Sequence, residues 1–237
     1  MIAGGYTLTG TKHEKNQDNF LIKNADGIEM FIVADGMGGH AAGDIASASA
    51  IQLIEKNLKD FSEESLKKAI LNANLQILLK SETKEEYKGM GTTLAMCMIK
   101  GSELFIAHIG DSRVYIDKGD GDIYVTKDHS VVQQMVDRGE ITGSQAKEHK
   151  MKNVITRALG VEENAKVEME LTDITEDTVI VFCSDGVSNV IDDDKLLTIA
   201  KENPPKKAAE ILCKTARKSG STDDITAIVV NARGEKQ

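Results

Sequence analysis

The stretch FIVADGMGG, residues 31–39, decides the fold of this chain. Its apolar residues end in an aspartate and a run of glycines, which is the pattern of a strand that leaves a core and turns. Three more aspartates sit at a turn at the end of a hydrophobic run: Asp18, Asp185 and Asp223. A carboxylate in such a position is held rigidly and still points into a cleft. Together with Asp35, these residues predict one hard-cation site built from oxygen ligands.

Length and composition suit a cytoplasmic globular protein. The 237 residues fit a single domain, residues 1–237, and 41% hydrophobic residues suffice for a core. A net charge of −9 argues against nucleic-acid binding. No run approaches the ~20 apolar residues that span a bilayer, and the first residues do not resemble a signal peptide, so we expect no membrane association. Three cysteines in apolar stretches, Cys97, Cys183 and Cys213, are expected to be reduced core residues.

The apolar pattern predicts helices mixed with strands at hairpin spacing. Helices are expected at residues 42–58, 62–79, 130–138, 193–202 and 206–218. Ser62 is a plausible N-cap, and Pro204 and Pro205 separate the last two helices. Strands are expected at residues 7–8, 19–22, 30–34, 92–99, 103–109, 113–116, 123–126, 167–171, 178–183 and 225–230. Hairpin spacing predicts antiparallel sheets whose faces the helices cover, hence a sandwich rather than a doubly wound parallel sheet.

Other phosphate- or metal-binding patterns fit poorly. Residues 36–41 match the dinucleotide fingerprint G-x-G-x-x-A, but Asp35 would lie beside the pyrophosphate, strands already precede it and hairpins follow it. No cysteine has an arginine six residues on, which excludes a cysteine phosphatase, and no Walker motif is present. Residues 117–128 resemble a calcium loop only superficially, because glycines fill ligand positions. A hairpin turn there is the better interpretation.

Eight short motifs in order give the chain a family resemblance. It resembles the metal-dependent PP2C-type (PPM) serine/threonine protein phosphatases, especially the compact bacterial ones, over nearly its whole length. The motifs are GTKHEKNQD at 10–18, VADGMGGHAAG at 33–43, GMGTT at 89–93, IGDSR at 109–113, DHS at 128–130, TRALG at 156–160, CSDGV at 183–187 and STDDIT at 221–226. Any one of them is weak, and their shared order is specific.

The resemblance implies an α+β fold, a four-layer α-β-β-α sandwich of two antiparallel sheets flanked by helix pairs. It implies two Mn²⁺ or Mg²⁺ ions at one edge and a weaker third. By position, Asp35 would bridge both ions, the Gly36 carbonyl would bind one, Asp185 and Asp223 would complete the other shell, Asp18 would hold metal-bound waters and Asp111 would serve the third ion. Residues 139–152 fall where the family has a mobile flap near the substrate entrance.

The implied reaction is hydrolysis of phosphoserine and phosphothreonine in proteins. Two cations would activate a bridging water and clamp the phosphoryl oxygens for in-line attack, without a phosphoenzyme. The implied partners are phosphorylated proteins made by a serine/threonine kinase, and the protein is expected to be a monomer.

Two positions depart from the family pattern. His13 stands where most members have an arginine that grips the substrate phosphate, so His13 is expected to contact phosphate or to act as an acid, with Lys12 or Lys15 as substitute point charges. Gln17 stands where a glutamate usually holds water on one metal. A minority branch of the family carries this same pairing, which favours activity.

Some alternatives stay open. A pseudophosphatase that only binds phosphoproteins is the competing function, although the retained Asp35, Asp185 and Asp223 speak against it. The segment Asp111-Ser112-Arg113 fits a structural arginine–carboxylate pair as well as a third-metal role. The other histidines singled out, His40, His108, His129 and His149, are expected to be structural or exposed.

Overall fold

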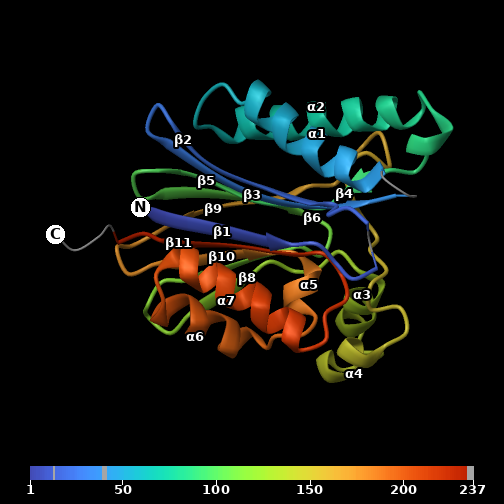
Figure 1. Ribbon diagram of the computed structural model, residues 1–237. Coiled ribbons are helices and arrows are strands. Elements are labelled where there is room, and N and C mark those ends of the chain that lie inside the picture. The colour runs from blue at the N-terminus through green and yellow to red at the C-terminus, as the bar shows by residue number, and fades with distance from the viewer. Residues whose placement is uncertain (13, 39–41, 234–237) are drawn as a thin grey trace.

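Two β-sheets stack face to face between layers of helices (Figure 1). The computed structural model describes residues 1–12, 14–38 and 42–233. One sheet has the order β2-β3-β5-β6-β9, with β4 beside β3, and the other has the order β1-β11-β10-β7-β8. Every strand pair among the described residues is antiparallel. The predicted α+β sandwich with α-β-β-α layers is therefore confirmed.

The strands lie close to where the sequence pattern placed them. The first sheet contains β2 (Asp18–Ala25), β3 (Ile28–Met37), β4 (Gly91–Thr92), β5 (Leu94–Lys100), β6 (Glu103–Ile109) and β9 (Glu168–Asp173). The second contains β1 (Ile2–Leu8), β7 (Arg113–Asp117), β8 (Ile123–Val125), β10 (Val179–Cys183) and β11 (Ile225–Asn231). β7 and β8 pair as a hairpin across residues 118–122, which confirms the turn expected there instead of a calcium loop.

Two helix pairs cover the outer faces of the sheets. α1 (Ala42–Asn57) and α2 (Glu63–Ser81) lie on the first sheet, and α6 (Asp193–Glu202) and α7 (Pro205–Lys218) lie on the second (Figure 1). Shorter elements stand at one end: η1 (Glu85–Tyr87), α3 (Val131–Asp137), α4 (Gly143–Glu148) and α5 (Asp185–Ser188). Among the described residues, no helix is both long and apolar enough to cross a membrane.

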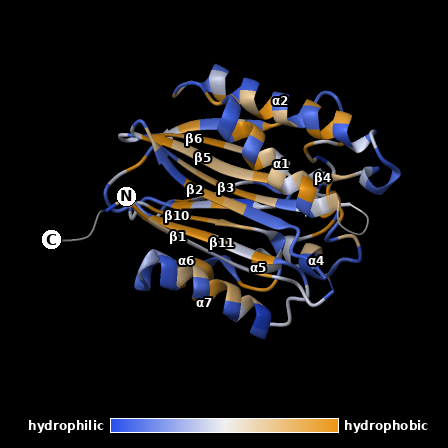
Figure 2. Ribbon diagram, turned by 45° about the horizontal axis from the view of Figure 1, so that its top comes forward, coloured by the Kyte–Doolittle hydropathy of each residue, from blue (hydrophilic) through white to orange (hydrophobic). Residues whose placement is uncertain are grey.

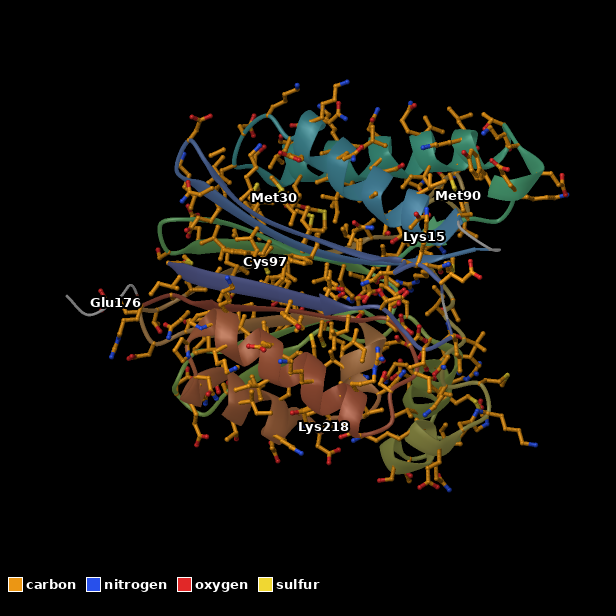
Figure 3. The ribbon with its side chains drawn as sticks, viewed as in Figure 1. Lys15, Met30, Met90, Cys97, Glu176 and Lys218 are labelled. Atoms are coloured by element: carbon orange, nitrogen blue, oxygen red, sulfur yellow. The ribbon has the colours of Figure 1, made fainter. Side chains whose placement is uncertain are left out.

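The alternation of side chains along β3 builds two layers of core. Met30 and Ile32 face α1 and α2, whereas Phe31 and Val33 face the second sheet, because successive side chains of a strand point to opposite faces. The Phe31 ring packs against Phe182 of β10 with 5.9 Å between centroids. Figure 2 shows the hydrophobic colours concentrated on these strands, and Figure 3 labels Cys97 between the two sheets. A strand buried on both faces reads as a continuous apolar run, as residues 31–34 do.

Local signals set the helix boundaries. The Ser62 hydroxyl accepts a hydrogen bond from the Ser65 N–H at 3.2 Å, which confirms the predicted N-cap of α2. Pro204 precedes α7 and Pro205 occupies its first turn, where a missing N–H costs nothing. The prolines therefore start α7 at the point where α6 has ended.

The sequence prediction was wrong in five places, and two of them are the break at Thr93 within the strand expected at residues 92–99 and the unexpected element η1. β1 begins at Ile2, not at residue 7, because Gly5 lets the strand pass closely over the Phe20 ring where any side chain would collide. α5 is a single turn that begins at Asp185, where the sequence pattern indicated only a turn. α4 was not expected, although Thr142 and Gln145 form a capping box at its start.

Candidate metal centre

All five predicted site aspartates gather at one end of the sandwich. Asp18 opens β2 and stands opposite Asp35 of β3. Asp185 lies two residues beyond the end of β10, and Asp223 precedes β11, which pairs with β10 at that end. Asp111 lies in the turn from β6 to β7, which connects the two sheets. Figure 3 shows side-chain oxygens collected between the sheets at this end, near the labelled Lys15.

The charges of these carboxylates act on one another. Burial raises the pKa of Asp35 well above its usual value, and the charges of Asp18, Asp185, Asp111 and Asp223 raise it further. Burial is the first cause for Asp18 and Asp185 too, and the pKa of each rises to about 7. The pKa of Asp111 is also raised, by burial and then by the charge of Asp185. Such a cluster is stabilised by a proton or by a cation.

In Asp18 and in Asp185, one carboxylate oxygen accepts a side-chain hydrogen bond and the other does not. Ser184 Oγ donates to Oδ2 of Asp18 at 2.7 Å, and Asn189 Nδ2 donates to Oδ2 of Asp185 at 2.9 Å. Oδ1 of Asp18 and Oδ1 of Asp185 are buried and find no hydrogen-bond partner among the described residues. An orphaned buried carboxylate oxygen is costly unless a cation meets it. The all-oxygen donor set therefore fits Mg²⁺ or Mn²⁺.

Gly36, the predicted carbonyl ligand, is buried beside Asp35 and pairs with Thr92 of β4. Its N–H donates to the carbonyl of Gln17 at 3.1 Å. A side chain on Gly36 would collide with the carbonyl of Gly43 in α1, so this close approach requires glycine. The buried Gln17 side chain lies against Gly43, at the same junction of β2, β3 and α1.

Asp224 is a residue of the centre that the sequence interpretation missed. It is 2% exposed, and its carboxylate accepts hydrogen bonds from the N–H groups of Gly10 at 2.5 Å and Gln17 at 2.8 Å. It thereby fastens the segment before Asp18 to the start of β11. Its charge also raises the pKa of Asp18. The two adjacent aspartates in STDDIT could have indicated this role, since one carboxylate can accept hydrogen bonds from backbone N–H groups while the other points into the site.

Arg113 pairs with Asp128, not with Asp111. Its Nε and Nη2 donate to the two oxygens of Asp128, each at 2.7 Å, which is a bidentate pair. The charge of Asp128 in turn raises the pKa of Asp185 and Asp111. The structural arginine–carboxylate pair foreseen near Arg113 is therefore present with another carboxylate, and Asp111 stays with the acidic cluster.

A second polar cluster, His108, His129 and Glu168, has the composition of a metal site. The two rings stack with 4.8 Å between centroids, and His129 Nε2 lies 3.0 Å from Glu168 Oε1. His129 Nδ1 accepts a hydrogen bond from the N–H of Gly110 at 3.1 Å, and His129 Nε2 also lies 3.2 Å from Nη1 of Arg157. His108 Nε2 lies 3.1 Å from the carbonyl oxygen of Lys127. The structural role expected for both histidines stays a prediction.

His13, the predicted phosphate contact or acid, lies outside the described residues, as does His40. Lys15, one of its suggested substitutes, is described. Its Nζ lies 3.5 Å from Oδ2 of Asp44 in the first turn of α1, and its side chain is largely exposed. The positively charged ammonium of Lys15 therefore lies near the junction where Gln17 meets Gly43.

A cleft of about 480 Å³ runs beside the acidic cluster. One wall comes from the predicted flap, with Lys147 and Lys152, and another from Asn189 and Asp193. Asp128 and Arg113 line its base. None of the five aspartates lines this cleft, but Asn189, which does, donates a hydrogen bond to Asp185.

Comparison with known proteins gives concordant results. The family model described as Protein phosphatase 2C matches residues 9–226. The serine/threonine phosphatase stp of Listeria monocytogenes is 33% identical over 228 residues, which cover 92% of this chain and 90% of that protein. Protein phosphatase PhpP of Streptococcus pneumoniae is 31% identical, with 97% and 96% covered.

Solved structures agree with this. The serine/threonine phosphatase PstP/Ppp of Mycobacterium tuberculosis superposes with a TM-score of 0.87 at 30% identity, covering 96% of each chain. A structure of the catalytic domain of PstP in complex with two manganese ions superposes with a TM-score of 0.84 at 29% identity, again covering 96% of each chain.

Proposed function

The chain belongs to the protein phosphatase 2C family and is a metal-dependent serine/threonine protein phosphatase, and we propose that its cluster of aspartates holds the catalytic cations. The observation that carries this proposal is the pair of buried, orphaned oxygens, Asp18 Oδ1 and Asp185 Oδ1, inside a group of carboxylates from both sheets. When bound there, two Mn²⁺ or Mg²⁺ ions would supply the neutralising charge and the activation of water that phosphate ester hydrolysis needs.

The residues of the chain divide the work as follows. The charges of four other aspartates act on Asp35, which is proposed to hold both cations, and the Gly36 carbonyl is proposed to hold one of them. Asp185 and Asp223 are proposed to complete one coordination shell, Asp18 to orient waters, and Asp111 to hold a weaker third ion. Ser184 and Asn189 hold the carboxylates in place, and Asp224 fixes the backbone beside them.

We propose that the substrate phosphate meets positive charge at the segment between Gly10 and Asp18. His13 is the proposed phosphate contact or general acid, on the strength of its place in the family pattern. We propose that Lys15 adds a second positive charge for the phosphate, because the Asp44 carboxylate 3.5 Å away holds the Lys15 ammonium near the junction of β2, β3 and α1. An ammonium attracts a phosphate dianion without the bidentate geometry of arginine.

Residues 139–152 are proposed to act as a flap over the substrate within a single domain, 1–237. Support comes from the cleft between α4 and the segment after α5, which opens beside the acidic cluster. A phosphoprotein segment that delivers a phosphoserine to Asp35 would run through this cleft.

The oligomeric state, the cellular location and the source of the substrates are inferred from the properties of the chain. We propose that it acts as a monomer in the cytoplasm on products of a serine/threonine kinase, independently of nucleic acid and membranes. The described site draws its carboxylates from one chain, the net charge is −9, and all three cysteines are buried and free. Reduced cysteines are usual in the cytoplasm.

Hydrolysis of p-nitrophenyl phosphate tests the activity. Turnover should require Mn²⁺ or Mg²⁺, vanish with EDTA and return when metal is restored. A phosphothreonine peptide should also be hydrolysed. A folded protein that binds phosphopeptides and hydrolyses neither substrate with Mn²⁺ present would instead be a pseudophosphatase.

A further inference from the structure

Asn189 contacts two functional parts of the molecule at once. It follows α5, and its Nδ2 donates to Oδ2 of Asp185 at 2.9 Å. The same amide nitrogen lies 3.5 Å from Oδ1 of Asn153, just beyond the proposed flap. Asn189 also lines the cleft beside the acidic cluster. One exposed side chain thus joins a proposed metal ligand to the flap side of the cleft.

We propose that Asn189 is a positioning residue that fixes the Asp185 carboxylate for the cation and ties it to the flap. This inference rests on the proposed function. A carboxylate can present either oxygen after a rotation of its side chain, so a donor that engages Oδ2 selects the other oxygen. Oδ1 of Asp185 is the oxygen that is buried without a hydrogen-bond partner among the described residues. The geometry therefore directs Oδ1 to the cation.

The amide suits this position better than an acid does. Asp185 already lies among Asp223, Asp128 and Asp111, whose charges act on one another. A neutral donor stabilises the ionised Asp185 without adding charge, whereas a carboxylate at 189 would add repulsion in the metal-free protein. Ser184 performs the same task for Asp18, also as a neutral donor.

The tie to the flap has a second contact on the same segment. Lys147 of α4 pairs with Oδ1 of Asp192 at 2.7 Å, three residues after Asn189. The segment from residue 185 to 192 therefore carries a proposed metal ligand at one end and an anchor for the flap at the other. If cation binding holds Asp185, and Asn189 with it, cation binding and flap docking favour each other, because coupling between two sites is reciprocal.

Calorimetric titration with Mn²⁺ tests the proposal on the full chain. Asn189→Ala and Asn189→Leu should bind Mn²⁺ about 10- to 100-fold more weakly than the wild type, the usual effect of removing a group that orients a ligand. Asn153→Ala should weaken binding by a few fold. Asn203→Ala is the matched control, because Asn203 donates to the Ile199 carbonyl at the end of α6, away from the centre, and it should bind as the wild type does.

Trypsin provides a second readout that does not depend on activity. The flap region offers Lys147, Lys150 and Lys152 as cleavage sites. Mn²⁺ should slow cleavage there in the wild type and in Asn203→Ala, and should slow it much less in Asn189→Ala at the same Mn²⁺ concentration. Melting curves in EDTA verify that each variant is folded.

The outcomes separate the claims. A wild type that binds no Mn²⁺ would overturn the proposed function itself. Wild-type binding with both Asn189 variants within twofold of it would overturn the positioning role alone. Weak binding in the Asn189 variants, with Asn153→Ala indistinguishable from Asn203→Ala and an unchanged trypsin pattern, would keep the positioning role and overturn the tie to the flap.

Discussion

Two buried aspartates at opposite ends of β10 have opposite surroundings. Asp117 of β7 pairs with Val179 at the start of β10 and is 2% exposed. Its carboxylate accepts a hydrogen bond from the Gly119 N–H and forms an ion pair with Lys201. These contacts lower its pKa. Asp185 follows the end of the same strand, is 8% exposed, and has a pKa raised to about 7.

The contrast shows how this fold distinguishes a structural carboxylate from a functional one. Asp117 receives its cation from the chain, as the ammonium of Lys201. Asp185 receives one neutral amide donor, and its other oxygen has no partner among the described residues. The chain thus completes the charge balance at one end of the strand, and we propose that a metal ion completes it at the other.

The largest effect should come from removing a proposed ligand. Asp35→Asn or Asp185→Asn should lower Mn²⁺-dependent turnover by at least about 100-fold, since metal ions supply several kcal/mol of transition-state stabilisation. The fold should remain, because loss of a repelling charge relieves the metal-free protein. Steady-state rates at saturating Mn²⁺, with circular dichroism as the folding control, measure this. Near-normal rates in either variant would contradict the two-metal assignment.

Metal binding should stabilise the whole fold. At one hundred times the dissociation constant, Mn²⁺ adds ~2.7 kcal/mol to the free energy of unfolding. For a chain of this size that raises the melting temperature by about 5–10 °C. Thermal melts in EDTA and in millimolar Mn²⁺ compare the two states, and equal midpoints would show that the aspartates do not form one cation site.

At the other end of β10, removing the cation partner of Asp117 should lower the stability of the fold and leave activity unchanged. Lys201→Met leaves the buried Asp117 without its cation and should cost about 1–3 kcal/mol of stability. Turnover and Mn²⁺ affinity should stay at wild-type values, because Lys201 does not contact the metal centre. A loss of Mn²⁺ affinity in this variant would mean that the two ends of the strand are not independent.

The metal-free protein should lose stability as the pH rises from about 4 to about 7. The folded-state pKa of Asp18 and Asp185 is about 7, above that of an unfolded aspartate, so the folded state holds protons that the unfolded state has lost. Stability therefore falls as the pH rises through the folded-state pKa. His108 and His129, whose pKa is lowered, oppose this slope below about pH 6.5, and they do so with and without metal. The melting temperature in Mg²⁺ should therefore exceed the melting temperature in EDTA by a margin that grows as the pH rises from about 5 to about 7, and parallel curves would count against the linkage.

The smallest effect concerns His13. An arginine there stays charged at alkaline pH and offers a bidentate fork, so His13→Arg should lower KM for a phosphopeptide a few fold, most clearly above pH 8, with little change in kcat. If His13 is a general acid, kcat for a phosphoserine peptide falls sharply instead, and kcat for p-nitrophenyl phosphate falls much less. No change in either constant on both substrates would remove His13 from the site.

Local patterns predicted most of the elements and the gathering of the aspartates. The double burial of β3 was readable in residues 31–34, and the helices of residues 42–58 and 193–202 followed from their periodicity and flanking signals. The family resemblance supplied the four-layer stacking and the proposed role of each ligand. The structure confirms the stacking, and the roles stay proposals.

Long-range pairing was not readable from the sequence. Neighbouring carboxylates look alike in a sequence, and the task of Asp224 is set by N–H groups more than 200 residues away. Asn189 lay beside a motif that was recognised, yet its role depends on which oxygen of Asp185 it engages. The choice of Asp128 as the partner of Arg113 likewise depends on how the turns pack at the end of the sheets.

Diffraction from crystals grown with Mn²⁺, with anomalous scattering to locate the ions, tests the central claim most directly. We expect at least two Mn²⁺ peaks between the sheets, both in contact with Asp35, with one facing Oδ1 of Asp185, and none beside Asp117. Peaks at His108, His129 and Glu168, or an acidic cluster without metal at saturating Mn²⁺, would contradict it.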